Sequence, residues 1–230
     1  DEDDHDQVLI DAVAELLGEV AKAFKEAFAP HFESLFPLLL KYVKPSRQAS
    51  DRFMAIGAIA ESCSHLKQHA APYIPHMLPI LAAGLQDESP GVRRNSAFCC
   101  GVFCLNCAEQ MGPYAMQVLQ GLQPLLKEDE QEEVRDNAVG AIARMIRGSP
   151  TSVPTAELVG LLAEHLPLTG DEDENGEVVT CLLTIYRGSP EALNPYLGKI
   201  VSAFVALLAE EERAKVLSDT AKAEMVAFIA

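Results

Sequence analysis

The sequence predicts an all-α fold, an α-solenoid in which antiparallel helix pairs stack one after another, and two periodic features predict it. First, Val134–Ile142 repeats the opening of Val92–Cys100 forty-two positions upstream, and Asp129 and Asp87 precede the two segments by the same distance. Second, prolines recur at intervals of 41 or 42 residues, at Pro30, Pro72, Pro113, Pro154 and Pro195. Repeats of about 40–47 residues are typical of stacked helix pairs.

The ends of the expected helices recur as regularly as their beginnings. Each periodic proline stands just ahead of an apolar run, where its missing N–H and fixed φ are harmless. Arg147–Pro150 returns as Arg187–Pro190, and there glycine can end a helix and proline prevents its continuation. These features are typical of HEAT repeats in a right-handed superhelix. We expect a single array over 1–230, with repeats near 1–28 (partial), 29–69, 70–111, 112–150, 151–190 and 191–230.

The apolar periodicity places the individual helices. They are expected over 7–28, 29–43, 46–66, 72–86, 90–109, 113–127, 131–147, 154–166, 177–186, 195–208 and 214–229. Pro37 and Pro79 lie at equivalent places inside two first helices and predict a bend, because an interior proline removes a hydrogen bond and costs about 3 kcal/mol. No strand alternation is visible. The chain ends inside an apolar run, so we expect it to be a piece of a longer solenoid.

Charge and composition limit the classes of partner. Among 230 residues, 18 are basic and 34 acidic, and the formal charge of −16 argues against direct binding of nucleic acid and favours a basic protein. No apolar run approaches the length of about 20 residues that spans a bilayer, and no signal peptide is visible, so we expect no membrane partner. Six cysteines without a paired framework suit a reducing compartment.

No motif for catalysis, metal binding or a cofactor emerges from the sequence. Cys104 and Cys107 form a Cys-x-x-Cys, but no second ligand pair follows, so buried core thiols are the favoured interpretation. His65 and His69, with His76 nearby, lack a further ligand and are interpreted as surface histidines. There is no nucleophile elbow and no phosphate loop, so we expect no enzyme activity.

In a solenoid of this kind the second helices are expected to line the concave side. Helices pack about 8–10 Å apart and an extended peptide rises about 3.3 Å per residue, so about three peptide residues would pass each helix. Asn95 and Asn137 occupy equivalent positions and could hold a peptide backbone, or else bond their own helix start or turn. If they hold a peptide, replacing both with alanine should weaken binding without changing the helical melt.

Charged residues supply the remaining candidates. Carboxylates on the second helices are expected to contact Lys or Arg of a basic cargo: Asp11, Glu15, Glu19, Asp51, Glu61, Glu109 and Asp136. Arg93 and Arg135 are expected to pair with acidic residues of the preceding turn and so join neighbouring repeats. An acidic insertion is expected either to hold a basic tail or to keep the array soluble; it contains Asp171, Glu172, Asp173, Glu174 and Glu177.

Three segments, Phe53–Glu61, Val92–Phe98 and Val134–Arg144, resemble HEAT repeats of the importin-beta superfamily of nuclear transport receptors. The resemblance implies a receptor that shuttles between cytoplasm and nucleus and carries basic cargo, notably core histones and some ribosomal proteins. It also implies contact with nuclear pore proteins and control by the Ran GTPase, through repeats absent here. The chain would be a cargo-binding segment that binds a histone tail or a similar nuclear localisation signal.

An alternative function remains open on the sequence alone. HEAT repeats also build scaffolds for multiprotein complexes, of the phosphatase-scaffold or chromosome-organising type. Such a scaffold should capture folded subunits along its ridges and ignore free basic tails.

Overall fold

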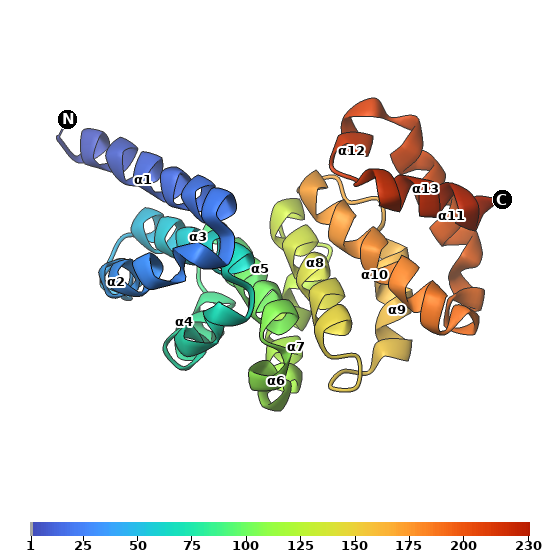
Figure 1. Ribbon diagram of the computed structural model, residues 1–230, viewed down its shortest axis with the longest axis horizontal. Helices are drawn as coiled ribbons and strands as arrows, with labels where there is room; N and C mark the ends of the chain where they lie inside the picture. The colour runs from blue at the N-terminus through green and yellow to red at the C-terminus, as the bar shows by residue number, and fades with distance from the viewer. Residues whose placement is uncertain (1) are drawn as a thin grey trace. The chain divides into compact units, whose positions relative to one another are not determined.

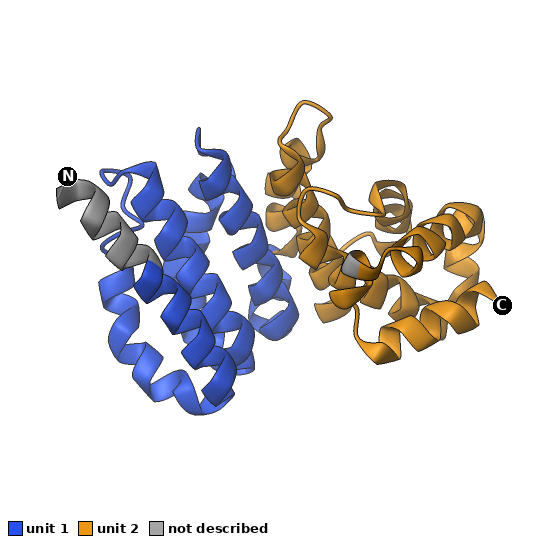
Figure 2. Cartoon of the chain, turned by 90° about the horizontal axis from the view of Figure 1, so that it is seen from above, with its two compact units in different colours: residues 1–114 blue, residues 115–230 orange. Residues whose placement is uncertain are grey.

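The computed structural model describes the backbone of residues 2–230 and the side-chain surroundings of residues 12–211 and 213–230. Throughout this described part the chain forms α-helices and short 3₁₀ helices, and no strand. The prediction of an all-α solenoid of helix pairs is confirmed. Residues 1–114 and residues 115–230 form two compact units (Figure 2).

Unit 1 contains two complete helix pairs and parts of two others. Its helices are α1 (Glu2–Phe24), α2 (Ala29–Leu39), α3 (Ala49–Leu66), α4 (Ile74–Gly84), α5 (Pro90–Asn106) and α6 (Ala108–Met111). The 3₁₀ helices η1 (Lys25–Phe28), η2 (Lys67–Tyr73) and η3 (Gly112–Tyr114) connect them. The second helices α1, α3 and α5 pack side by side in that order (Figure 1).

The core of unit 1 lies between the first and second helices. Phe32 of α2, Ile56 and Ile59 of α3, Met77 of α4 and Phe103 of α5 are all buried. Each such side chain contributes about 1.5–3 kcal/mol on transfer from water. The amphipathic pattern of the sequence therefore has its expected result, because each helix buries one stripe against its neighbours.

Unit 2 repeats the arrangement with α7 (Ala115–Leu122), α8 (Glu132–Gly148), α9 (Thr155–His165), α10 (Asn175–Gly188), α11 (Leu197–Ala209), α12 (Glu211–Lys215) and α13 (Asp219–Ile229). Its 3₁₀ helices are η4 (Gln123–Leu126), η5 (Glu172–Glu174) and η6 (Pro190–Tyr196). The second helices α8, α10 and α13 follow one another, with α10 packed against both of the others. Ile142, Val179 and Phe204 lie in its core.

The expected helices agree with the observed ones apart from their ends. Several recurring prolines, such as Pro72 and Pro195, lie within 3₁₀ helices that precede the first α-helix of a pair. Pro37 and Pro79 lie inside α2 and α4, two and five residues before those helices end at Leu39 and Gly84. The acidic insertion is shorter than expected, because α10 already begins at Asn175.

One apolar stretch is longer than the sequence pattern indicated. The helical run Pro190–Ala209 has 20 residues and, by length and composition alone, could cross a membrane. This corrects the expectation that no run approaches that length. One face of α11 is fully buried in the core of unit 2, through Ile200, Phe204 and Leu207. Packing within the unit accounts for that face, although only 28% of the run is buried.

The six cysteines are buried and free, which confirms their interpretation as core thiols. Burial raises the pKa of Cys104 to about 12 and that of Cys107 to about 11. Cys107 donates a weak hydrogen bond to the carbonyl of Lys67, with 3.7 Å between Sγ and O. Because the thiolate is the form that binds metals and attacks electrophiles, these thiols are unreactive at neutral pH.

Candidate functional site

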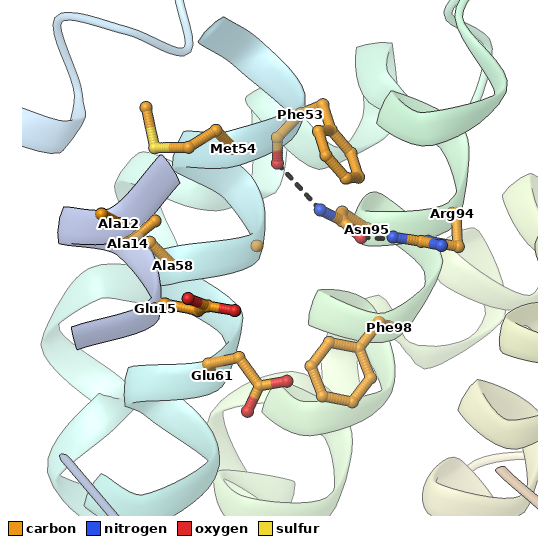
Figure 3. A pocket seen from close by; sticks show the side chains of 11 residues that line it. Ala12, Ala14, Glu15, Phe53, Met54, Ala58, Glu61, Arg94, Asn95 and Phe98 are labelled. Carbon is orange, nitrogen blue, oxygen red and sulfur yellow. Dashed lines mark hydrogen bonds between the residues drawn. The ribbon is translucent and has the colours of Figure 1, made fainter. Parts of the chain in front are cut away.

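A hollow of about 670 Å³ opens on the face formed by the three second helices of unit 1. Its wall is made only of residues from these helices: Ala12, Ala14 and Glu15 of α1, Phe53, Met54, Gly57, Ala58 and Glu61 of α3, and Arg94, Asn95 and Phe98 of α5. Figure 3 shows these side chains around the opening. The hollow, called the groove below, therefore lies on second helices, where the sequence analysis expected a peptide to bind.

Two carboxylates lie on the α1 and α3 side of the hollow. Glu15 and Glu61 are both exposed, and Figure 3 shows Glu61 beside the ring of Phe98. Alanines such as Ala14 and Ala58 leave the space beside the carboxylates open. This side of the hollow joins negative charge to a small apolar wall.

The α5 side is polar and held in place by neighbouring groups. Asn95 donates from Nδ2 to the backbone carbonyl of Phe53 at 2.8 Å. Arg94 donates from Nε to Oδ1 of Asn95 at 3.4 Å, and its guanidinium carbon lies 5.3 Å from the centroid of the Phe53 ring. Cation–π contacts of this length contribute about 0.5–1 kcal/mol at partly exposed sites.

The hydrogen bond of Asn95 to Phe53 matches neither of the two sequence interpretations. It bonds neither its own helix start nor its own turn but the second helix of the preceding repeat. Gly57 makes this approach possible, because a Cβ there would lie only 2.6 Å from Nδ2 of Asn95. One N–H of the Asn95 amide is used by Phe53, and the amide carries a second.

Asn137 and Asp136 of unit 2 are buried and bond within the chain, which contradicts their assignment to cargo binding. Asn137 donates from Nδ2 to the carbonyl of Glu133 at 2.8 Å and to Oδ2 of Asp171 at 2.7 Å. Asp136 accepts the backbone N–H groups of Gly170 and Asp171 at 2.8 and 3.0 Å. Burial raises the pKa of Asp136, although these N–H groups act in the opposite direction. Both residues fasten α8 to the loop that precedes α10.

Three of the five acidic residues of the insertion pair with arginines of the chain. Glu174 is buried and forms two hydrogen bonds with Arg144, at 2.6 and 3.0 Å, while Glu177 pairs with Arg147. Glu172 pairs with Arg213 at 2.9 Å, and Asp171 accepts from Asn137. Asp173 is exposed. The insertion is therefore a fastening between α8, α10 and α12, which corrects the expectation that it holds a basic tail.

Three other predicted carboxylates, Glu19, Asp51 and Glu109, are not among the described residues that line the groove. Glu19 is exposed on α1 and pairs with Lys22 at 3.2 Å, and Asp51 of α3 lies 3.7 Å from Arg47. Glu109 is exposed on α6. The side chain of Asp11 lies outside the described residues. Exposed pairs of this kind contribute about 0–1 kcal/mol.

Arg93 and Arg135, which were predicted to pair with acidic residues of the preceding turn, both contact the backbone of that turn. Each donates from Nη1 to backbone carbonyls of its own preceding turn, Arg93 to Asp87 and Glu88 at 2.8 and 3.0 Å. Arg135 reaches Lys127, Glu128 and Glu130 at 3.4–3.5 Å. Arg52 forms an ion pair between repeats, because its Nη2 lies 2.8 and 2.9 Å from the two oxygens of Asp87.

Eight groove residues were absent from the predicted site, among them Phe53, Gly57, Arg94 and Phe98. One signal in the sequence could have found two of them. Phe53 precedes Asn95 by the repeat length, and Gly57 is an unfavourable residue inside a helix, where it costs about 1 kcal/mol relative to alanine. A glycine in that place indicates a close approach by a neighbouring element.

Comparison with known proteins places the chain among transport-receptor relatives. The family described as "Importin subunit beta-1-like, TPR repeats" matches residues 2–139. The chain is 26% identical over its whole length to probable importin subunit beta-4 of Schizosaccharomyces pombe, and 30% identical over 88% of its length to importin-4 of Homo sapiens. It covers 21% and 19% of those two proteins, so it spans about a fifth of their length.

Solved structures show the same fold. A crystal structure of a Kap121p mutant superposes with a TM-score of 0.74 at 16% identity, covering 98% of this chain and 20% of that one. A designed armadillo repeat protein in complex with the peptide (KR)4 superposes with a TM-score of 0.59 at 22% identity, covering 95% of this chain and 92% of that one. Because the family match covers more than half of the residues, the chain belongs to the importin-beta family of helical-repeat proteins.

Proposed function

We propose that this chain is a cargo-binding segment of a nuclear import receptor and that it binds a basic peptide, such as a histone tail, on the second helices of unit 1. The observation that carries the proposal is the groove across α1, α3 and α5, in which Glu15 and Glu61 lie opposite Arg94 and Asn95. The groove crosses three neighbouring helices, so an extended peptide of about nine residues would contact all of them.

Electrostatics and the comparisons support a basic ligand. The chain carries a formal charge of −16, so a basic segment is attracted before it makes contact. Much of the acidic charge of unit 2 is paired internally, as with Glu174 and Glu177, whereas Glu15 and Glu61 are exposed at the groove. The designed armadillo protein of similar fold was crystallised with an alternating Lys-Arg peptide.

The family supplies the wider setting of this proposal. Kap121p, which shares the fold, has been crystallised with RanGTP. Release of cargo under control of Ran, contact with nuclear pore proteins, and shuttling between cytoplasm and nucleus therefore belong to the same proposal. Core histones and some ribosomal proteins are the expected cargo class.

A titration of the chain with a fluorescent, lysine-rich histone-tail peptide tests the proposal. Binding should be strongest at low salt and should weaken on the order of tenfold as the ionic strength rises past 0.15 M, where the Debye length is about 8 Å. Binding that is absent at low salt, or unaffected by salt, contradicts the proposal. Capture of folded subunits with no binding of free tails would favour the scaffold function instead.

A further inference from the structure

We propose that the edge of unit 1 at which α1 and α3 end is a binding surface for an acidic segment of a partner protein, held by the ammonium groups of Lys25 and Lys67. The two lysines are forty-two residues apart and occupy equivalent positions, each directly after a second helix. Because α1 and α3 pack side by side (Figure 1), these positions lie about one helix spacing apart, about 8–10 Å. Neither lysine lines the groove, so this surface is separate from the proposed site for a basic peptide.

Both lysines are exposed and available to a partner. Neither side chain forms an ion pair or a hydrogen bond with the residues that the structure describes. The exposure of Lys67 does not result from the end of the array, because α3 packs against α1 on one side and α5 on the other. The repeat geometry itself therefore leaves this position open.

The end of α3 does not need a lysine to satisfy its last carbonyl groups. Asn106 of the next repeat donates from Nδ2 to the carbonyls of Cys63 and Ser64, at 3.1 and 3.3 Å. The carbonyl of Lys67 itself accepts from the thiol of Cys107. Neutral donors from α5 and from the residue that follows it therefore bond this helix end, and the ammonium of Lys67 takes no part.

The backbone of both lysines is strained. Lys25 has φ 51° and Lys67 has φ 53°, and ψ at Lys67 is −131°. Glycine adopts such angles without a clash. The strain of a non-glycine residue there exceeds the stabilisation that a cation contributes at a helix C-terminus. Lysine at these two positions is thus unfavourable for the fold alone, and strained residues of this kind cluster where ligands are held.

The surroundings of the two lysines are locally positive, although the chain has a formal charge of −16. His65 lies near the end of α3. Burial lowers the pKa of His65, and Lys67, Lys22 and Lys25 lower it further, while Glu19 acts in the opposite direction. Three ammonium groups therefore act together on one place at this edge of the unit.

A short acidic segment fits this surface better than a large anion. A nucleic acid or an anionic membrane would extend past the lysines and meet carboxylates such as Glu19 and Glu26, which are exposed nearby. In a polyproline II segment every third residue faces the same side, about 9 Å apart, which matches one helix spacing. An acidic residue at every third position thus places one carboxylate against each lysine.

A binding experiment with the whole chain tests this surface. A fluorescent peptide of repeated Glu-Pro-Pro is titrated with the unaltered chain, with K25Q/K67Q and with K41Q/K44Q, and a peptide of repeated Gln-Pro-Pro serves as the neutral probe. Lys41 and Lys44 are exposed in the turn after α2, so the control variant removes the same charge from another part of unit 1. Vesicles of phosphatidylserine and phosphatidylcholine form a separate arm.

We expect the Glu-Pro-Pro peptide to bind the unaltered chain and K41Q/K44Q alike, and to bind K25Q/K67Q about fivefold more weakly. Absence of binding, equal affinities of the two variants, or equal binding of the neutral peptide overturns the proposal. Vesicles that bind through Lys25 and Lys67 while the peptide does not would assign the surface to a membrane and also overturn it. Matching helical melts of the two variants show that a difference in affinity does not come from unfolding.

Discussion

The second-helix faces of the two units use equivalent positions in opposite ways. In unit 1 Phe98 lines an open groove, whereas in unit 2 the residue forty-two positions later is Gly140. The space that a side chain would occupy there is filled by the carboxylate of Glu174, since a Cβ on Gly140 would lie 1.6 Å from its Oε2. One repeat position therefore lines an open groove in one unit and lies beside an internal ion pair in the other.

The neighbouring positions differ in the same way. Arg94 and Asn95 border the groove, while their counterparts Asp136 and Asn137 bond the loop before α10. The difference teaches that the bonds of a charged or amide side chain in a helical repeat depend on which groups the next repeat places beside it. Four predictions, ordered by expected size, test this contrast.

Gly140→Ala should have the largest effect on stability. The new Cβ would displace the carboxylate of Glu174 and leave Arg144 buried without its partner, and breaking a buried pair in this way costs about 3–5 kcal/mol. Urea unfolding measures the loss. Gly198→Ala in α11 is the matched control, because nothing lies within 4 Å of its Cβ, and it should gain up to about 1 kcal/mol from helix propensity. Equal stabilities of the two variants would show that the ion pair does not depend on the glycine.

Glu174→Gln should change the pH dependence of stability. Burial raises the pKa of Glu174 from 4.5 to about 7, Asp171 and Glu177 add to the rise, and Arg144 opposes it. Since the folded pKa is the higher one, the folded chain holds this proton more tightly, and stability falls as pH rises from about 4.5 to about 7.

This linkage amounts to on the order of 3 kcal/mol across that window. The difference in unfolding free energy between the unaltered chain and Glu174→Gln, measured from pH 4.5 to pH 8, should therefore change steadily up to pH 7 and then level off. If the difference in unfolding free energy did not change with pH, the pKa of Glu174 would be the same in the folded and unfolded chain.

Asn137→Ala should destabilise the chain more than Asn95→Ala. The first removes two hydrogen bonds, one of them to the carboxylate of Asp171, at a cost of about 2–3 kcal/mol, and the second removes the bond to Phe53 at about 1 kcal/mol. Chemical unfolding measures both. Peptide binding should respond in the reverse order, weakening in Asn95→Ala and staying unchanged in Asn137→Ala. The expectation that replacing both asparagines with alanine leaves the helical melt unchanged is therefore wrong, because Asn137 holds α8 to the loop before α10.

Lys67→Gly should give the smallest effect, a stabilisation of about 1 kcal/mol. Lys67 has φ 53°, and Lys25, forty-two positions earlier, has φ 51°. Glycine adopts positive φ without the clash that a Cβ causes. We expect the strain energy that is removed to exceed the free-energy cost of glycine's extra entropy in the unfolded chain. Thermal melting measures the stability of Lys67→Gly. The control is Lys22→Gly inside α1, which should lose about 1 kcal/mol of stability. A loss of stability in Lys67→Gly would contradict the argument from strain.

Much of the site lay beyond sequence reasoning for an identifiable reason. Glu15, Glu61 and Asn95 were predicted to bind cargo, and the structure brings them to one groove. Asp136 and Asn137 were chosen by the same rule and are buried within unit 2. The rule counted positions along each helix, and it had no information about the loop between α9 and α10, which folds back onto α8.

The sequence by itself determined the helix pairs of this protein and their spacing, because the recurring prolines and apolar stripes act locally within each helix. It also determined the excess of negative charge. Only the tertiary structure decided which carboxylates are neutralised and which are exposed, since Arg144 meets Glu174, and Arg213 meets Glu172, across distances that no local pattern encodes. Pairing of charges depends on which surfaces come together, and that is settled when the helices pack.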